Sequence, residues 1–175
     1  MVVFVIGGSG SGKSEYAEGV IMGFGRCKRY YIATMQAYDD EARAKIRRHR
    51  EMRKDKGFDT IECQKGLPLV DIEPGSDVLL ECISNLAANE MFDPAGAGPD
   101  TVTSVMAGVD RLADMCRNLV IVSNNIFGDG ADYSPETSEY IGKVAEINGK
   151  IAERADKVVE VVYGIPLVNE KRAGL

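Results

Sequence analysis

The sequence predicts an α/β fold in which a mostly parallel sheet carries helices on both faces. Short apolar or β-branched runs alternate with longer stretches of helical periodicity, which is the pattern of β-α-β units joined by right-handed crossovers. The length of 175 residues corresponds to a single domain spanning 1–175. In sheets of this kind ligands bind at the carboxyl ends of the strands. The expected buried strands span residues 2–6, 30–33, 78–80, 119–122 and 158–162.

Helical segments are expected between these strands. Residues 40–56 carry many charges and contain neither glycine nor proline, which predicts an exposed helix. A further helix is expected to begin at Ser134 and Pro135, an N-cap followed by proline at the first helical position. Residues 93–99, DPAGAGP, predict a mobile loop because glycine and proline oppose both helix and strand. After the first strand, apolar residues recur at helical spacing at positions 17, 20, 21 and 24.

Composition excludes several classes of protein. With 45% apolar and 27% charged residues, a chain of this length buries a core without disulfides or a structural metal. No apolar run reaches the roughly 18 residues of a membrane span, and the start lacks the features of a signal peptide, so we expect a cytoplasmic protein. The four cysteines are scattered singly, which favours buried thiols over zinc ligands.

The charge distribution contains one strong exception. The net charge of -6 argues against nucleic acid as a partner. Residues 43–56, however, hold eight lysines and arginines against two acidic residues. This segment is either a solvated helix face or a basic patch suited to a small polyanion such as a nucleotide.

Residues 7–14, GGSGSGKS, match the phosphate-binding pattern G-x-x-x-x-G-K-[ST] between a strand and an amphipathic helix. Glycines allow backbone N–H groups to turn inward around a phosphate at the positive end of the helix. Lys13 would bridge the β- and γ-phosphates, and the Ser14 hydroxyl would bind Mg²⁺. The sequence therefore predicts a P-loop NTPase whose triphosphate is held by Gly7, Gly8, Ser9, Gly10, Ser11, Gly12, Lys13 and Ser14.

A P-loop usually acts with an acid at the end of a neighbouring strand. Glu81 ends the apolar run at 78–80 and is expected to complete the magnesium site with Ser14. The alternative is an ordinary loop carboxylate or ion-pair partner.

His49 is the single histidine and lies inside the basic segment. Taken alone, a surface histidine is most often a solvated side chain. Lys45 and Arg53, four residues on either side, share its helical face and favour the neutral imidazole. Neutral imidazole is a nucleophile toward phosphorus, and the neighbouring arginines could neutralise charge on an attacked α-phosphate. His49 is therefore a candidate covalent nucleotidyl carrier.

Seven motifs fall in order across nearly the whole chain. They are GGSGSGKSEYAE (7–18), YIAT (31–34), AKIRRHREMR (44–53), TIEC (60–63), LLECISNLAANEMF (79–92), VIVSNN (120–125) and ADKVVEVVYGIPL (155–167). A histidine in a basic helix after YIAT, followed by T-x-E and a strand ending in E-C, is far more specific than the P-loop. Together the motifs resemble the bifunctional adenosylcobinamide kinase and adenosylcobinamide-phosphate guanylyltransferase family of cobalamin biosynthesis.

The resemblance implies a RecA-like P-loop fold, a homotrimer and two reactions on one corrinoid substrate. ATP or GTP phosphorylates the aminopropanol arm of adenosylcobinamide. GTP then gives its GMP moiety to the family's histidine, which His49 matches, and GMP passes to the substrate phosphate to form adenosylcobinamide-GDP. Mg²⁺ is the implied cofactor. By motif, Glu62 and Glu81 would contact nucleotide or metal, and the nucleotide site would also include Ala33, Thr34, Met35, Arg50, Glu51, Met52 and Arg53.

The last third of the chain departs from the family pattern. Asn125 replaces the usual glutamate, and uncharged or acidic residues stand where arginine and aspartate are typical, at Glu139, Ile141 and Gly142. These departures concern the kinase half and the corrinoid contacts, not His49. Two other functions stay open: a P-loop small-molecule kinase without a covalent histidine step, and a non-catalytic nucleotide-binding regulatory module.

Overall fold

The computed structural model describes residues 1–37, 40–126 and 133–170, and the side chains of all of these except positions 41, 42, 45, 49, 52 and 170. The strands form one sheet in the order β3-β2-β4-β5-β1-β6-β7. All neighbouring strands are parallel except β6 and β7, which form an antiparallel hairpin. The strands are β1 (Val2–Gly7), β2 (Arg29–Ala33), β3 (Phe58–Glu62), β4 (Asp77–Glu81), β5 (Asn118–Asn124), β6 (Lys157–Val162) and β7 (Ile165–Glu170).

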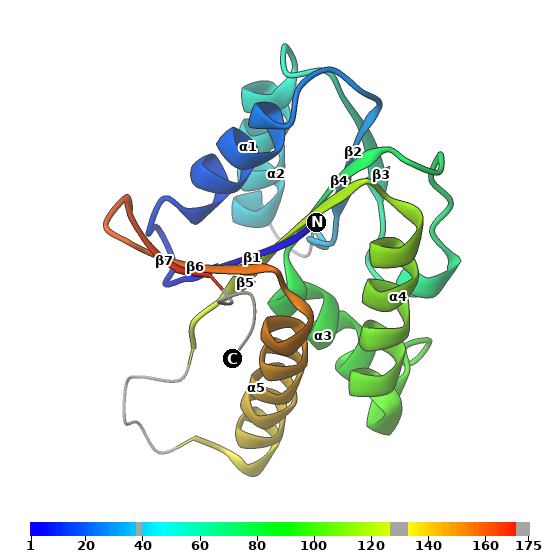
Figure 1. Ribbon diagram of the computed structural model, residues 1–175. Coiled ribbons are helices and arrows are strands. Elements are labelled where there is room, and N and C mark those ends of the chain that lie inside the picture. The colour runs from blue at the N-terminus through cyan, green and yellow to red at the C-terminus, as the bar shows by residue number, and fades with distance from the viewer. Residues whose placement is uncertain (38–39, 127–132, 171–175) are drawn as a thin grey trace, which may run out of the picture.

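Helices cover both faces of the sheet, as predicted. One face carries α1, with α2 beside it, and the other carries α3, α4 and α5 (Figure 1). Two 3₁₀ turns, Leu67–Leu69 and Gly98–Asp100, complete the described elements. The helices are α1 (Lys13–Gly23), α2 (Asp40–Arg53), α3 (Ile83–Phe92), α4 (Thr101–Met115) and α5 (Pro135–Arg154).

Alternation along the central strand β1 builds the two halves of the core. Val3 and Val5 pack with Ile21 of α1, whereas Phe4 packs with Leu112 of α4 on the opposite face. All five side chains are buried. Burying a side chain of this size contributes roughly 1.5–3 kcal/mol, so apolar burial on both faces fixes the sheet between its helices. The predicted class, an α/β P-loop fold with a mostly parallel RecA-like sheet, is confirmed.

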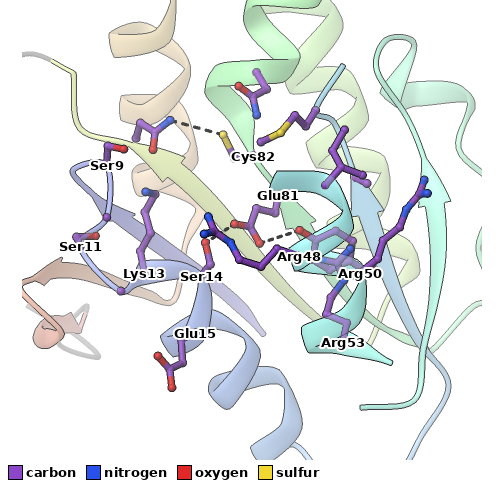
Figure 2. A pocket seen from close by; sticks show the side chains of 18 of the residues that line it. Ser9, Ser11, Lys13, Ser14, Glu15, Arg48, Arg50, Arg53, Glu81 and Cys82 are labelled. Carbon is purple, nitrogen blue, oxygen red and sulfur yellow. Dashed lines mark hydrogen bonds between the residues drawn. The ribbon is translucent and has the colours of Figure 1, made fainter. Parts of the chain in front are cut away.

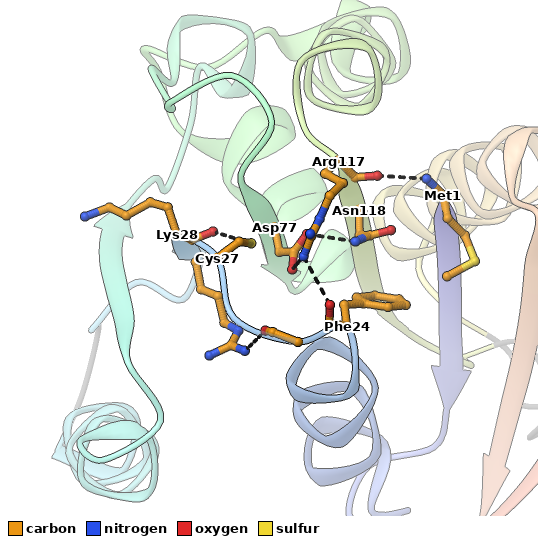
Figure 3. A network of polar contacts seen from close by, with 9 residues as sticks. Met1, Phe24, Cys27, Lys28, Asp77, Arg117 and Asn118 are labelled. Carbon is orange, nitrogen blue, oxygen red and sulfur yellow. Dashed lines mark hydrogen bonds and ion pairs between the residues drawn. The ribbon is translucent and has the colours of Figure 1, made fainter.

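A polar network closes the amino-terminal edge of the sheet (Figure 3). The buried Asp77 carboxylate accepts hydrogen bonds from Arg117 Nε and Nη2 at 3.1 and 2.9 Å, and from Asn118 Nδ2 at 2.8 Å. Burial alone would raise the pKa of Asp77, but these donors outweigh it and hold the pKa below its usual value. The Met1 ammonium also donates to the Arg117 carbonyl oxygen at 2.9 Å. This edge lies opposite the carboxyl ends of the strands.

Residues 93–97 form neither helix nor strand, as predicted, but Gly98 and Pro99 begin the 3₁₀ turn Gly98–Asp100. The predicted mobility of 93–99 stays a prediction, and the segment is tied to the helix before it. The buried Glu90 carboxylate accepts from Ala97 N–H at 2.9 Å and from Gly66 N–H at 2.7 Å. Gly96 packs so closely on α3 that a Cβ there would lie 2.4 Å from the Glu90 carbonyl oxygen.

Two further expectations concern the state of the cysteines and the presence of a membrane-spanning helix. The four cysteines are free thiols, and burial raises the pKa of Cys63 and of Cys116 to about 11. Among the helices in the described part of the chain, none combines the length and apolar character needed to cross a membrane.

Candidate functional site

The predicted P-loop connects β1 to α1 at the carboxyl edge of the sheet. Gly10 and Gly12 adopt φ of +70° and +89°, which side chains disfavour, and Gly12 is the N-cap of α1. Lys13 is only 8% exposed, and its Nζ donates to the Gly8 carbonyl oxygen at 3.0 Å. The lysine ammonium is thus folded over the loop, at the positive end of α1, where a phosphate binds in such loops.

The β6-β7 hairpin packs against the backbone of the P-loop. Gly164 N–H donates to the Ser11 carbonyl oxygen at 2.7 Å. A Cβ on Gly12 would lie 3.3 Å from Gly164 Cα, and a Cβ on Gly7 would lie 2.6 Å from the Val161 carbonyl oxygen. Two glycines of the motif therefore serve close backbone packing in addition to any ligand.

Ser14 and Glu81 meet, as the metal prediction requires. Ser14 Oγ donates to Glu81 Oε1, and the Tyr31 hydroxyl donates to Glu81 Oε2 at 2.9 Å. A serine hydroxyl beside a carboxylate is a pair of hard oxygen donors, which fits Mg²⁺ because that ion usually takes one or two protein ligands and keeps water or phosphate oxygens. Burial, and then the neighbouring Glu81 charge, raise the pKa of Tyr31 well above its usual value, so its hydroxyl stays a donor.

One cavity of about 540 Å³ joins the P-loop to α2 (Figure 2). Its wall combines the loop, the magnesium pair and basic side chains from α2. The residues lining it are Ser9, Gly10, Ser11, Gly12, Lys13, Ser14, Glu15, Tyr31, Ala33, Met35, Ile46, Arg48, Arg50, Arg53, Glu62, Glu81, Cys82, Asn85 and Asn124.

The helix α2 turns one face toward this cavity. Arg50 pairs with Glu62 of β3, and Lys56, just after the helix, pairs with Glu18 of α1. Positions 46, 50 and 53 line the cavity, and position 49 shares their helical face by spacing. The backbone of His49 is therefore placed beside the cavity, while its side chain lies outside the described residues.

Most predicted nucleotide residues come together here, but four do not line the cavity. Thr34 is fully buried beneath it, where its hydroxyl donates to the Cys82 carbonyl oxygen at 2.8 Å and accepts from Cys82 N–H at 2.7 Å. Glu51 is exposed and lies 3.8 Å from Lys54. Gly7 and Gly8 form the base of the loop instead. The Met52 side chain, like that of His49, is not described.

Six residues that line the cavity were not predicted from the sequence as site residues: Glu15, Tyr31, Ile46, Arg48, Cys82 and Asn85. Tyr31 lies in a predicted buried strand, where it is indistinguishable from a core aromatic. The only available signal was its place on the strand beside the one that ends in Glu81. Cys82 and Asn85 follow that acid, and burial raises the pKa of the Cys82 thiol, which makes it a poor nucleophile.

A second cavity, of about 530 Å³, adjoins the other side of the P-loop at Gly8. Its described wall is mostly apolar and aromatic. Tyr140 anchors it by donating to the Ser84 carbonyl oxygen at 3.1 Å and by packing on Phe92, with ring centroids 6.0 Å apart. The lining consists of Gly8, Asn125, Ile126, Tyr133, Thr137, Tyr140 and Ile141.

The sequence matches a family model described as cobinamide kinase / cobinamide phosphate guanyltransferase over residues 3–168. A bifunctional adenosylcobalamin biosynthesis protein, CobU, of Escherichia coli (strain K12) is 34% identical over 140 residues, covering 72% of this chain and 76% of that protein. The protein of the same name from Salmonella typhimurium (strain LT2) is 38% identical over 100 residues. That match covers 55% of this chain and about half, 53%, of the relative.

Solved structures agree with the fold at low sequence identity. An ATPase from a bacterial type III secretion system gives a TM-score of 0.53 at 10% identity, covering 91% of this chain and 50% of that one. A KaiC-like protein from Pyrococcus horikoshii OT3 gives 0.50 at 12% identity, covering 91% and 71%. At such identities the likeness establishes the fold alone.

Proposed function

This chain belongs to the cobinamide kinase / cobinamide phosphate guanyltransferase family, and is thus a transferase, and we propose that it performs both reactions of that family name on adenosylcobinamide. In the first, a nucleoside triphosphate, ATP or GTP, phosphorylates the substrate hydroxyl. In the second, GTP gives GMP to the resulting phosphate through a guanylyl-histidine at His49. The corrinoid is a substrate in both steps.

The observation that carries this proposal is the single cavity shared by the P-loop and α2. Lys13 comes from the P-loop, and Arg48, Arg50 and Arg53 come from α2. Two kinds of phosphate chemistry need two sets of cations, one for the β- and γ-phosphates and one for the α-phosphate. A cavity of about 540 Å³ is within the range of nucleotide-sized ligand sites.

In the kinase step the P-loop binds the triphosphate and orients it for in-line attack by the substrate hydroxyl. Lys13 bridges the β- and γ-phosphates and neutralises charge as the bond to the leaving diphosphate breaks. Ser14 and Glu81 would hold Mg²⁺, which supplies electrostatic stabilisation of the phosphate oxygens when bound.

In the guanylyl step a neutral His49 imidazole attacks the α-phosphorus of GTP. A nitrogen–phosphorus bond forms, the bond to the β-phosphate oxygen breaks, and pyrophosphate leaves. A phosphate oxygen of the substrate then attacks the same phosphorus and releases the histidine. Arg50 and Arg53 lie on the face of α2 that includes position 49, and are suited to neutralise the oxygens of that phosphorus.

The apolar second cavity is the proposed site of the corrinoid acceptor. It meets the P-loop at Gly8, the residue to which Lys13 donates, so an acceptor there would lie beside the terminal phosphate. Its isoleucines and tyrosines suit the apolar edge of a large ring system, and Asn125 and Thr137 offer partners for amide groups. The departures at Asn125 and Ile141 fall in this wall.

The predicted homotrimer also has a candidate surface. The edge strand β7 exposes Ile165, Leu167 and Val168, at 63%, 50% and 45%, beside the 93% exposed Tyr163. An exposed apolar edge strand promotes association unless a partner covers it. We expect Leu167→Lys to lower the assembly state, measured by sedimentation.

Two labelling experiments test the two reactions. With γ-labelled ATP or GTP and Mg²⁺, label should pass to cobinamide; with α-labelled GTP, it should pass to cobinamide phosphate. A simple small-molecule kinase would show only the first transfer, and a regulatory module would bind nucleotide and show neither. Either of those results would contradict the proposal.

A further inference from the structure

Arg53 is a buried cation whose side chain has donors to spare. It is 5% exposed, and its Nε and Nη1 atoms have no hydrogen-bond partner among the described residues. Its guanidinium carbon lies 3.4 Å from the centre of the Tyr31 ring. Burying a charge without a partner is costly, so a position of this kind is explained when a ligand supplies the missing acceptor.

Carboxylates that could neutralise Arg53 are already engaged. Glu81 accepts from Ser14 at one oxygen and from the Tyr31 hydroxyl at the other. Glu62 pairs with Arg50. Figure 2 shows Glu15 pointing away from Arg53. Arg53 and Glu81 therefore both line the cavity, but they do not form an ion pair with each other.

Tyr31 separates these two groups by using both parts of its side chain. The ring face holds the guanidinium of Arg53 through a cation–π contact, and the hydroxyl holds the Glu81 carboxylate at 2.9 Å. Tyr31 is itself 3% exposed and packs edge-on against Phe58, with ring centroids 6.1 Å apart. Phe58 thus provides a third contact that holds the Tyr31 ring in place between Arg53 and Glu81.

We infer that Tyr31 is a positioning residue that keeps Arg53 open for a phosphate oxyanion, by holding Glu81 and the guanidinium apart. The ligand class is the polyphosphate chain of a nucleotide, in which Arg53 would bind oxygens of the α-phosphate and of the pyrophosphate that leaves it. This inference rests on the proposed use of the cavity for nucleotide. It gives the Tyr31 side chain a function that neither the motifs nor the family name assigns.

The hydroxyl of Tyr31, which contacts Glu81, can be removed with or without its ring, which contacts Arg53. Tyr31→Phe keeps the platform for Arg53 but releases one Glu81 oxygen, which is then available to pair with the guanidinium. Tyr31→Leu removes the platform as well. Tyr30→Phe is the matched control because the neighbouring residue in a strand faces the opposite side of the sheet, where Tyr30 packs in the other half of the core.

The test is calorimetric titration of the full chain with pyrophosphate in the absence of Mg²⁺, with thermal melting as a check on folding. We expect Tyr31→Phe to weaken pyrophosphate binding about tenfold, the size of one lost charge-assisted hydrogen bond. Tyr31→Leu should weaken it at least as much, and Tyr30→Phe should bind like the wild type. Arg53→Gln should also weaken binding about tenfold, and adding Tyr31→Phe to it should cost nothing further.

That lack of additivity distinguishes positioning through Arg53 from a general structural effect. Wild-type affinity in Tyr31→Phe, or an equal loss in the Arg53→Gln background, would overturn the inference and leave the proposed reactions untouched. Failure of the wild-type chain to bind pyrophosphate would overturn it too. Binding as expected, together with no phosphoryl or guanylyl transfer, would instead contradict the proposed function alone.

Discussion

Gly7 packs directly on the main chain of Val161: a Cβ at Gly7 would lie 2.6 Å from the Val161 carbonyl oxygen. The adjacent Gly8 has open space, since a Cβ there meets no atom within 4 Å. Gly7 is the fixed first glycine of the motif G-x-x-x-x-G-K-[ST], whereas Gly8 occupies a variable position. The strand β6 therefore dictates the first glycine of the P-loop.

We expect Gly7→Ala to push the P-loop off β6, lowering the free energy of unfolding by about 1–3 kcal/mol and nucleotide affinity by at least about tenfold. Gly8→Ala should leave the free energy of unfolding close to that of the wild type and the nucleotide affinity within about twofold of it. Thermal melting and titration with a nucleotide measure the two effects. Equal behaviour of the two variants would show that backbone packing is not what the first glycine provides.

Lys13→Ala should lower kcat/KM for γ-phosphate transfer by roughly 100-fold or more, because the proposed mechanism assigns the contact with the β- and γ-phosphates to this lysine. The fold should survive, since α1 keeps its buried residues Ala17 and Ile21. Steady-state kinetics and circular dichroism separate the two. A folded variant with wild-type kcat/KM would remove Lys13 from the mechanism.

The Asp77 network makes a prediction about pH. The pKa of Asp77 is held below its usual value in the folded chain, so its contribution is complete above the unfolded-state pKa of about 3.9 and is lost as pH falls through the lower folded value. Asp77→Asn should destabilise the protein by about 1–3 kcal/mol at pH 7 and reduce the acid dependence of stability. Urea unfolding between pH 7 and pH 3 measures both.

The KM for nucleotide is the control measurement for Asp77→Asn. Asp77 lies at the amino-terminal edge of the sheet, away from the P-loop, so KM for nucleotide should not change in folded Asp77→Asn. An unchanged acid slope, or an altered KM, would contradict the assignment of Asp77 to stability.

The second cavity can be tested without touching the P-loop. Ile141→Glu places a charge in the apolar wall and should raise KM for cobinamide about tenfold or more, while KM for nucleotide stays the same. Glu139→Gln is the control on the same helix, because Glu139 is exposed and outside the cavity. Should the two variants have equal KM for cobinamide, the acceptor binds elsewhere.

Much of this fold could be predicted because its central strands are short, apolar and buried on both faces. The strands β3 and β7 escaped prediction for the opposite reason. β3 is an edge strand in which only Phe58 and Ile61 are half-buried and the other three residues are exposed, and β7 is an exposed edge that contains Pro166. Helices were expected between the strands, but the positions of α3 and α4 were not predicted, although α4 is amphipathic and buries Val105, Val109 and Leu112.

Some residues of the candidate site could likewise be predicted from the sequence, and others could not. The P-loop and Glu81 could be predicted because spacing and strand position fix them locally. Tyr31 could not, since its role depends on which side chains reach its ring and its hydroxyl from α2 and β4. Thr34 was expected at the nucleotide by its match to the family motif, whereas it is buried and its hydroxyl hydrogen-bonds the backbone of Cys82.

The most direct test of the central claim is incubation of the full chain with Mg²⁺ and GTP labelled at the α-phosphate, followed by intact mass and acid treatment, beside His49→Ala. We expect one GMP per chain, lost in acid because a phosphoramidate is acid-labile, and absent from the variant. No adduct under turnover conditions, or an adduct that persists in His49→Ala, would contradict a covalent guanylyl-histidine.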